Sequence, residues 1–88
     1  MSDVTIYSTQ FCPFCVRAKQ LLDDKGVRYR NIAVDKKPQL RQEMMQKSGR
    51  RTVPQIFLGK EHIGGCDELY ALERAGKLDK KLEQFLNH

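Results

Sequence analysis

The most informative stretch of this 88-residue sequence is QFCPFCVR, residues 10–17, in which two cysteines stand three positions apart and a proline follows the first. An alternating apolar run at residues 4–7 ends just before this stretch, and apolar residues at helical spacing follow it. We therefore expect both cysteines where a strand turns into a helix. Pro13 suits the first helical position, because its missing N–H would have no partner there and its fixed φ is already helical.

This position gives the two sulfur atoms different expected roles. Cys12 falls in the cap region, at the positive end of the helix dipole and near backbone N–H groups without helical partners. Both features favour the thiolate, which is the form that attacks disulfides. Cys15 lies one turn further along the same face, so the two sulfur atoms can meet. The pattern predicts a dithiol/disulfide redox site, and the alternatives are half of a zinc site or two inert core thiols.

The composition is typical of one soluble domain spanning residues 1–88. Hydrophobic residues make up 40% of the chain and charged residues 31%. The first residues have neither the basic nor the apolar region of a secretory signal, and no apolar run approaches the ~18 residues of a membrane span. Three cysteines are an odd number, so they cannot be a closed set of structural disulfides. We expect a cytoplasmic protein without a membrane partner.

The formal net charge of +5 is spread along the chain. A nucleic-acid-binding surface would cluster basic residues with aromatic ones, and the lysines and arginines here show no such cluster. We interpret the charge as a solvated surface that is compatible with steering a small anion, and we expect no nucleic-acid partner.

The remaining pattern predicts the order β-α-β-α-β-β-α with a short C-terminal helix. Strands are expected at residues 4–7, 27–34, 53–58 and 61–63, and helices at residues 13–25, 38–48, 68–75 and 79–86. Asp67 and Asp79 are expected to cap the last two helices. The opening β-α-β unit implies a parallel strand pair with a right-handed crossover. The expected class is α/β, with helices covering a four-stranded mixed sheet.

Three blocks of the sequence together resemble the dithiol glutaredoxins of the thioredoxin-fold superfamily. The blocks are Cys12-Pro13-Phe14-Cys15, Thr52-Val53-Pro54-Gln55 and Gly64-Gly65-Cys66-Asp67. Their order and spacing are similar to those of the small bacterial glutaredoxins, closest to the glutaredoxin 3 type, and the likeness covers essentially the whole chain.

This resemblance implies a thioredoxin fold with helices on both faces of the sheet. It also implies a monomeric, glutathione-dependent thiol-disulfide oxidoreductase that reduces protein disulfides and protein–glutathione mixed disulfides. Glutathione would be the electron-donating co-substrate, with no bound cofactor or metal. Its other partners would be disulfide-containing or glutathionylated proteins, among which ribonucleotide reductase is one candidate.

The resemblance assigns a role to each matching residue. Cys12 would be the nucleophile and Cys15 the resolving thiol. Thr52, Val53 and Pro54 would form the loop that faces them, with Pro54 in the cis form. The backbone N–H and C=O of Val53 could then pair with extended glutathione as with a short added strand.

The other implied contacts lie around the ends of the tripeptide. Gly65, Cys66 and Asp67 would hold the γ-glutamyl end, since backbone N–H groups at a helix start suit its carboxylate and the Asp67 carboxylate suits its ammonium group. Arg41 would contact the glycyl carboxylate, and Phe14 would pack beside the tripeptide. Simpler roles stay open: a helix cap for Asp67, a solvated side chain for Arg41 and a small buried thiol for Cys66.

Two positions depart from the family pattern. Phe14 stands where the family often has tyrosine, and Thr9 stands where it often has lysine. Without that lysine, a thiolate at Cys12 would depend more on the helix end and on Arg17 or Lys19.

Two other functions are compatible with parts of the pattern. The first is a glutaredoxin-like redoxin that thioredoxin reductase, a flavoprotein, would reduce; the features at residues 65–67 and Arg41 argue against it. The second is a metal-binding or iron–sulfur protein that uses Cys12, Cys15 and Cys66. A structural zinc site usually has four close ligands, and the sequence has neither a second CxxC nor a histidine pair. Cluster-carrying relatives typically have a CGFS-like site, which this chain lacks.

Overall fold

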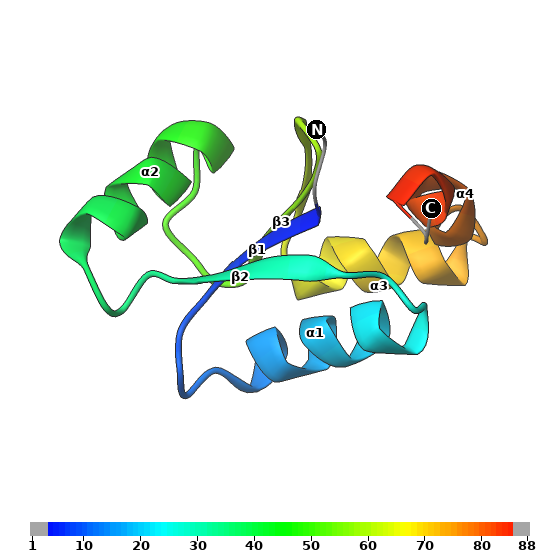
Figure 1. The fold of residues 1–88 in the computed structure, drawn as a ribbon, viewed down its shortest axis with the longest axis horizontal. Coiled ribbons are helices and arrows are strands. Elements are labelled where there is room, and N and C mark those ends of the chain that lie inside the picture. Colours follow the sequence, from blue (N-terminus) through cyan, green and yellow to red (C-terminus); the bar gives the residue numbers. More distant parts are fainter. Residues whose placement is uncertain (1–3, 86–88) are drawn as a thin grey trace.

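Strand β1, Val4–Ser8, lies inside a four-stranded sheet with the order β2-β1-β3-β4 in the computed structural model, which describes residues 4–85. The other strands are β2 (Tyr29–Ala33), β3 (Gln55–Leu58) and β4 (Glu61–Gly64). The helices are α1 (Pro13–Asp24), α2 (Pro38–Ser48), α3 (Cys66–Arg74) and α4 (Leu78–Leu82), followed by the 3₁₀ turn η1 (Glu83–Phe85). Helices α1 and α3 cover one face of the sheet and α2 covers the other (Figure 1).

The strand pairing confirms the predicted mixed sheet. Strand β1 runs parallel to β2 and antiparallel to β3, and β3 pairs with β4 as an antiparallel hairpin. Strands β2 and β3 are shorter than predicted. Strand β3 begins only at Gln55, since Pro54 has no N–H to give to a ladder. Val27 and Val34 lie outside β2, although their side chains are buried.

Each face of the sheet has its own apolar core, because alternate residues of a strand point to opposite faces. The core under α1 and α3 contains Val4, Ile6, Ala18, Leu21, Leu22, Val27, Ile56, Leu58, Cys66, Leu69, Leu78 and Leu82. The core under α2 contains Tyr7, Val34, Met44 and Phe57. This division explains the imperfect alternation around β2, since Val27 and Val34 belong to different cores.

Two helix starts differ from the sequence-based expectation. Helix α3 begins at Cys66 with Gly65 as its cap, so Asp67 lies in the first turn and the predicted Asp67 cap is wrong. Helix α4 begins at Leu78, so Asp79 is not its cap either. Asp79 instead forms an ion pair with Lys25 at 2.7 Å, which ties the end of α1 to α4. The predicted end of the last helix at residue 86 lies outside the described residues.

Helices α1 and α2 both begin at a proline, as predicted, and are followed by glycines with positive φ. Gly26 has φ 74° and Gly49 has φ 70°, a conformation that costs glycine little and other residues more. Within residues 4–85, no helix combines the length and the apolar character that a membrane span requires.

The packing of α1 on the sheet gives a stability prediction. Leu22 is fully buried in the core under α1, whereas Gln20 on the same helix is exposed. Leu22→Ala should lower the free energy of unfolding by about 2–5 kcal/mol, because it removes buried methyl groups and leaves a cavity. Gln20→Ala should change it by no more than about 0.5 kcal/mol. Urea denaturation of the two variants measures both values, and equal effects would contradict the described packing.

Candidate active site

Cys12 is the cap residue of α1, in an extended conformation with φ −120° and ψ 107°. Its Sγ accepts a hydrogen bond from the backbone N–H of Cys15 at 3.2 Å, and its carbonyl oxygen accepts the N–H of Val16 at 3.1 Å. The sulfur therefore occupies the place of a capping oxygen. A backbone donor and the positive end of α1 both favour negative charge on this sulfur.

Cys15 has a different environment one turn further into α1. Its side chain is only 1% exposed. Burial, together with a hydrogen bond to the Cys12 side chain and the charge at Cys12, raises the pKa of the Cys15 thiol. Cys15 is accordingly a neutral thiol at pH 7, held next to the more accessible Cys12. The structure brings together one accessible and one buried sulfur, one turn apart as the sequence predicts.

The loop that faces the cysteines contains a cis peptide bond between Val53 and Pro54. The carbonyl oxygen of Val53 lies 3.9 Å from Cys12 Sγ. Gln55 fixes the loop from the protein interior, since its buried Nε2 donates to the carbonyl oxygen of Thr52 at 2.9 Å and to the Thr52 hydroxyl at 3.2 Å. Burial and the nearby Arg50 charge lower the pKa of His62, whose neutral ring lies 2.7 Å from Gln55 Oε1.

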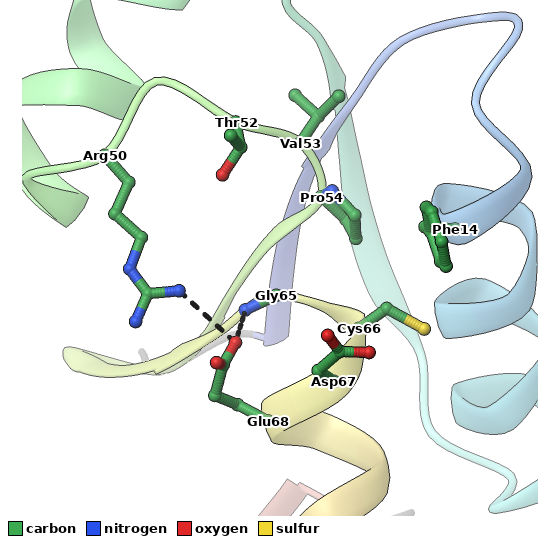
Figure 2. A pocket seen from close by; sticks show the side chains of 9 residues that line it. All are labelled: Phe14, Arg50, Thr52, Val53, Pro54, Gly65, Cys66, Asp67 and Glu68. Atoms are coloured by element: carbon green, nitrogen blue, oxygen red, sulfur yellow. Dashed lines mark hydrogen bonds and ion pairs between the residues drawn. The ribbon is translucent and has the colours of Figure 1, made fainter.

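A cavity of about 200 Å³ lies between this loop and the start of α3 (Figure 2). It is lined by Phe14, Arg50, Thr52, Val53, Pro54, Gly65, Cys66, Asp67 and Glu68. Seven of these were candidates from the sequence, drawn from segments that lie far apart along the chain. Two lining residues, Arg50 and Glu68, were not. Arg41 lies outside the lining, where its Nη1 donates to the carbonyl oxygen of Arg51 at 3.4 Å.

Glu68, and not Asp67, is the acidic residue whose side chain accepts a backbone N–H at the start of α3. Glu68 Oε1 accepts the N–H of Gly65 at 2.6 Å and a hydrogen bond from Arg50 Nη1 at 3.3 Å. These donors, the Gly65 N–H first, lower the pKa of Glu68. The sequence signal was available, because an acidic residue three positions after a helix cap is one half of a capping box. Asp67 remains exposed at the rim of the cavity.

Glycine is required directly before this helix. Gly64 has φ 121°, and a Cβ there would come within 2.7 Å of Glu68 Oε1. A Cβ on Gly65 would lie 3.2 Å from the carbonyl oxygen of Pro54. The two walls of the cavity therefore approach each other closely at its base.

Cys66 is a buried thiol in the cavity wall. Burial raises its pKa, and the positive charge of Arg17 partly opposes the effect. Arg17 lies over the ring of Tyr70 with its guanidinium carbon 5.6 Å from the centroid, which directs this cation toward α3. Among residues 4–85, no three histidine, cysteine or acidic side chains are grouped closely enough to hold a metal ion.

Comparison with known proteins places this geometry in a family. The glutaredoxin family model matches residues 4–63, which is more than half of the chain. The chain belongs to the glutaredoxin family. It is 60% identical over 82 residues to a glutaredoxin of Pseudomonas aeruginosa, covering 93% of this chain and 98% of that protein. It is 51% identical over 83 residues to glutaredoxin 3 of Escherichia coli K12, covering 94% and 100%.

The solved structures agree with this assignment. A crystal structure of a buckwheat glutaredoxin–glutathione complex superimposes with a TM-score of 0.89 and is 34% identical in sequence, covering 98% of this chain and 83% of that one. The predicted thioredoxin fold is confirmed. Since glutaredoxins are thiol-disulfide oxidoreductases, the chain is an enzyme of that class.

The unequal burial of the three thiols predicts an order of alkylation. At pH 7, iodoacetamide should label Cys12 first and label Cys15 and Cys66 at least about tenfold more slowly, because burial and a raised pKa keep those two protonated. Raising the pH should accelerate labelling of Cys15, since a thiol with a raised pKa ionises only in alkaline solution. Mass spectrometry of digested, time-quenched samples gives the three rates.

The same measurement in guanidinium chloride is the control, where the unfolded chain should label all three cysteines at similar rates. Labelling of Cys15 or Cys66 as fast as Cys12 in the folded protein at pH 7 would contradict the described site.

Proposed function

We propose that this protein uses glutathione to reduce protein–glutathione mixed disulfides and protein disulfides, with Cys12 as the nucleophile and Cys15 as the resolving thiol. The observation that carries the proposal is the position of Cys12 Sγ. It accepts the Cys15 N–H at the start of α1 and lies 3.9 Å from the Val53 carbonyl oxygen, beside the cavity. The glutathione complex of the buckwheat protein supports the choice of ligand.

The cavity offers groups that match the parts of a γ-glutamyl tripeptide. The backbone of Val53 would pair with the extended cysteinyl unit. Since the Gly65 N–H is bonded to Glu68, the N–H groups of Cys66 and Asp67 in the first turn of α3 would bind the γ-glutamyl carboxylate, with Gly65 leaving room for it. The exposed Asp67 carboxylate would receive the ammonium group.

Further proposed contacts lie around this core of the site. Phe14, which is 52% exposed and lines the cavity, would pack against the tripeptide, with Thr52 and Pro54 opposite. We keep Arg41 as the proposed partner of the glycyl carboxylate, which it would reach by exchanging the Arg51 carbonyl oxygen for the ligand.

The mixed-disulfide reaction needs only Cys12. Its thiolate attacks the glutathione sulfur of the mixed disulfide, the bond to the protein sulfur breaks, and the protein leaves as a thiolate that takes up a proton. The thiolate of a second glutathione then attacks the glutathionyl sulfur on Cys12. Oxidised glutathione leaves and the Cys12 thiolate is regenerated.

Reduction of a protein disulfide also uses Cys15. The Cys12 thiolate attacks one sulfur of the disulfide and forms a mixed disulfide with it, and the other substrate sulfur leaves as a thiolate. Cys15 then loses its proton and attacks the Cys12 sulfur, so that the Cys12–Cys15 bond forms and the second substrate thiolate leaves. Negative charge at Cys12 is one cause of the raised pKa of Cys15. That cause disappears once Cys12 is in a disulfide, so Cys15 is more easily ionised at the step that needs it. Two glutathione molecules then reduce the Cys12–Cys15 bond.

The segment around Cys12 carries exposed apolar side chains. Among the described residues, the exposed large hydrophobic side chains are Phe11 at 89%, Phe14 at 52% and Val16 at 57%, all within four positions of Cys12. Apolar side chains gathered on a surface commonly mark a site of protein contact. We propose that a protein chain next to the reacting disulfide packs against Phe11, the most exposed of the three and the residue directly before Cys12.

Single cysteine variants test the assignment of roles. Cys15→Ser should keep activity on a glutathionylated peptide and lose most activity on a protein disulfide, because only the second reaction needs a resolving thiol. Cys12→Ser should lose both activities to the uncatalysed background. The measurement is NADPH oxidation coupled through glutathione reductase, with Cys66→Ser as a cysteine control that keeps both reactions. Full turnover by Cys12→Ser would contradict the proposal.

The electron donor can be tested with the unmodified protein. Turnover should be supported by glutathione with glutathione reductase and not by thioredoxin reductase alone. The reverse result would favour the flavoprotein-reduced redoxin and would remove glutathione from the mechanism.

A further inference from the structure

The ion pair between Arg50 and Glu68 joins the two walls of the cavity. Arg50 follows Gly49, at the end of α2, and Glu68 lies in the first turn of α3. Arg50 extends from the loop toward Glu68 across one end of the cavity, and its Nη1 lies 3.3 Å from Glu68 Oε1 (Figure 2). The two side chains are 46% and 44% exposed, so a pair of this kind contributes little to folding. The main effect of the ion pair is on the net charge of the cavity lining.

Glu68 places a negative charge where an anionic ligand has to approach. Its carboxylate accepts the Gly65 N–H at 2.6 Å, at the helix start that the proposed function assigns to the γ-glutamyl carboxylate. Its lowered pKa keeps it ionised at neutral pH. Asp67 adds a second carboxylate to the lining. A ligand carboxylate would therefore meet two negative charges on this wall.

Arg50 is the cation that offsets this charge. Of the nine lining residues, three are charged: the two carboxylates of Asp67 and Glu68 and the guanidinium of Arg50. With Arg50 paired to Glu68, one carboxylate is neutralised and the Asp67 carboxylate remains for a cation. This arrangement suits a ligand end that carries one ammonium and one carboxylate group side by side.

We infer that Arg50 is a specificity-determining residue that acts through Glu68, by neutralising it so that the zwitterionic γ-glutamyl end can bind next to Asp67. The inference rests on the proposed function, since it assumes that glutathione occupies this cavity. Arg50 is here a positioning residue of the charge pattern, and it has no part in the exchange of sulfur bonds.

A double-mutant cycle tests this role. Arg50→Gln removes the cation and should raise the KM for a glutathionylated peptide about fivefold with little change in kcat. Glu68→Gln keeps an oxygen for the Gly65 N–H and should lower that KM, because Arg50 is then unopposed. The variant with both substitutions should return to within about twofold of the wild-type KM, since neither charge is left.

Two controls separate this effect from general ones. The same peptide carrying β-mercaptoethanol in place of glutathione has no zwitterionic end, so Arg50→Gln should leave unchanged the rate at which the reduced protein releases this peptide in a single turnover without added glutathione. Arg51→Gln removes the same charge from the neighbouring residue, which is exposed and outside the lining, and should change neither substrate's KM by more than about twofold. Thermal unfolding of every variant shows whether the fold is kept.

The outcomes distinguish the inference from its alternatives. A double variant as poor as Arg50→Gln alone would show that Arg50 contacts the ligand directly, and would overturn the inference. Equal losses on both peptides, together with a lower unfolding temperature, would show a purely structural role and would also overturn it. A wild-type protein that does not prefer the glutathionylated peptide would instead overturn the proposed function. A wild-type preference that Arg50→Gln leaves unchanged would overturn only the inference about Arg50.

Discussion

The hydrogen bond from the Cys15 N–H to Cys12 Sγ depends on where α1 begins, and the site is arranged around it. Strand β1 ends at Ser8, a short loop follows, and Pro13 starts the helix, so Cys12 is left in the cap position with its sulfur in place of a capping oxygen. One turn later the same helix buries Cys15. A single helix start thus leaves one sulfur accessible with a backbone N–H donor and keeps the other buried as a neutral thiol.

The ligand side of the site is built at the same end of the sheet, because the start of β3 pairs with the end of β1 through Tyr7 and Gln55. Gln55 fixes the loop at Thr52 from inside the protein, while Glu68 fixes the start of α3 through Gly65. The two walls meet closely at the base of the cavity, and Arg50 joins them at one end. The reacting sulfur atoms therefore belong to the start of α1, and most proposed binding contacts belong to the loop before β3 and to the start of α3.

Local rules predicted the fold and the position of the two cysteines, whereas the other candidate site residues came from the resemblance to the glutaredoxins. Pro13 and the apolar spacing around it placed the cysteines at a helix start, and strand alternation gave the mixed sheet. Those rules could not predict which side chains from distant segments pair in the folded chain. The sequence predicts a helix cap at Asp79, whereas in the folded chain Asp79 forms an ion pair with Lys25. Arg50 and Glu68 are 18 positions apart, and only the packing of the loop on α3 makes them a pair at the cavity.

The central claim is that Cys12 is the sulfur that first takes glutathione from a mixed disulfide. The most direct test is to mix the reduced wild-type protein with one equivalent of a glutathionylated peptide and quench within milliseconds with acid and an alkylating reagent. Peptide mass spectrometry then locates the transferred glutathione. The account predicts it on Cys12, with Cys15 and Cys66 carrying none. Glutathione found first on Cys15 or Cys66 would contradict the account.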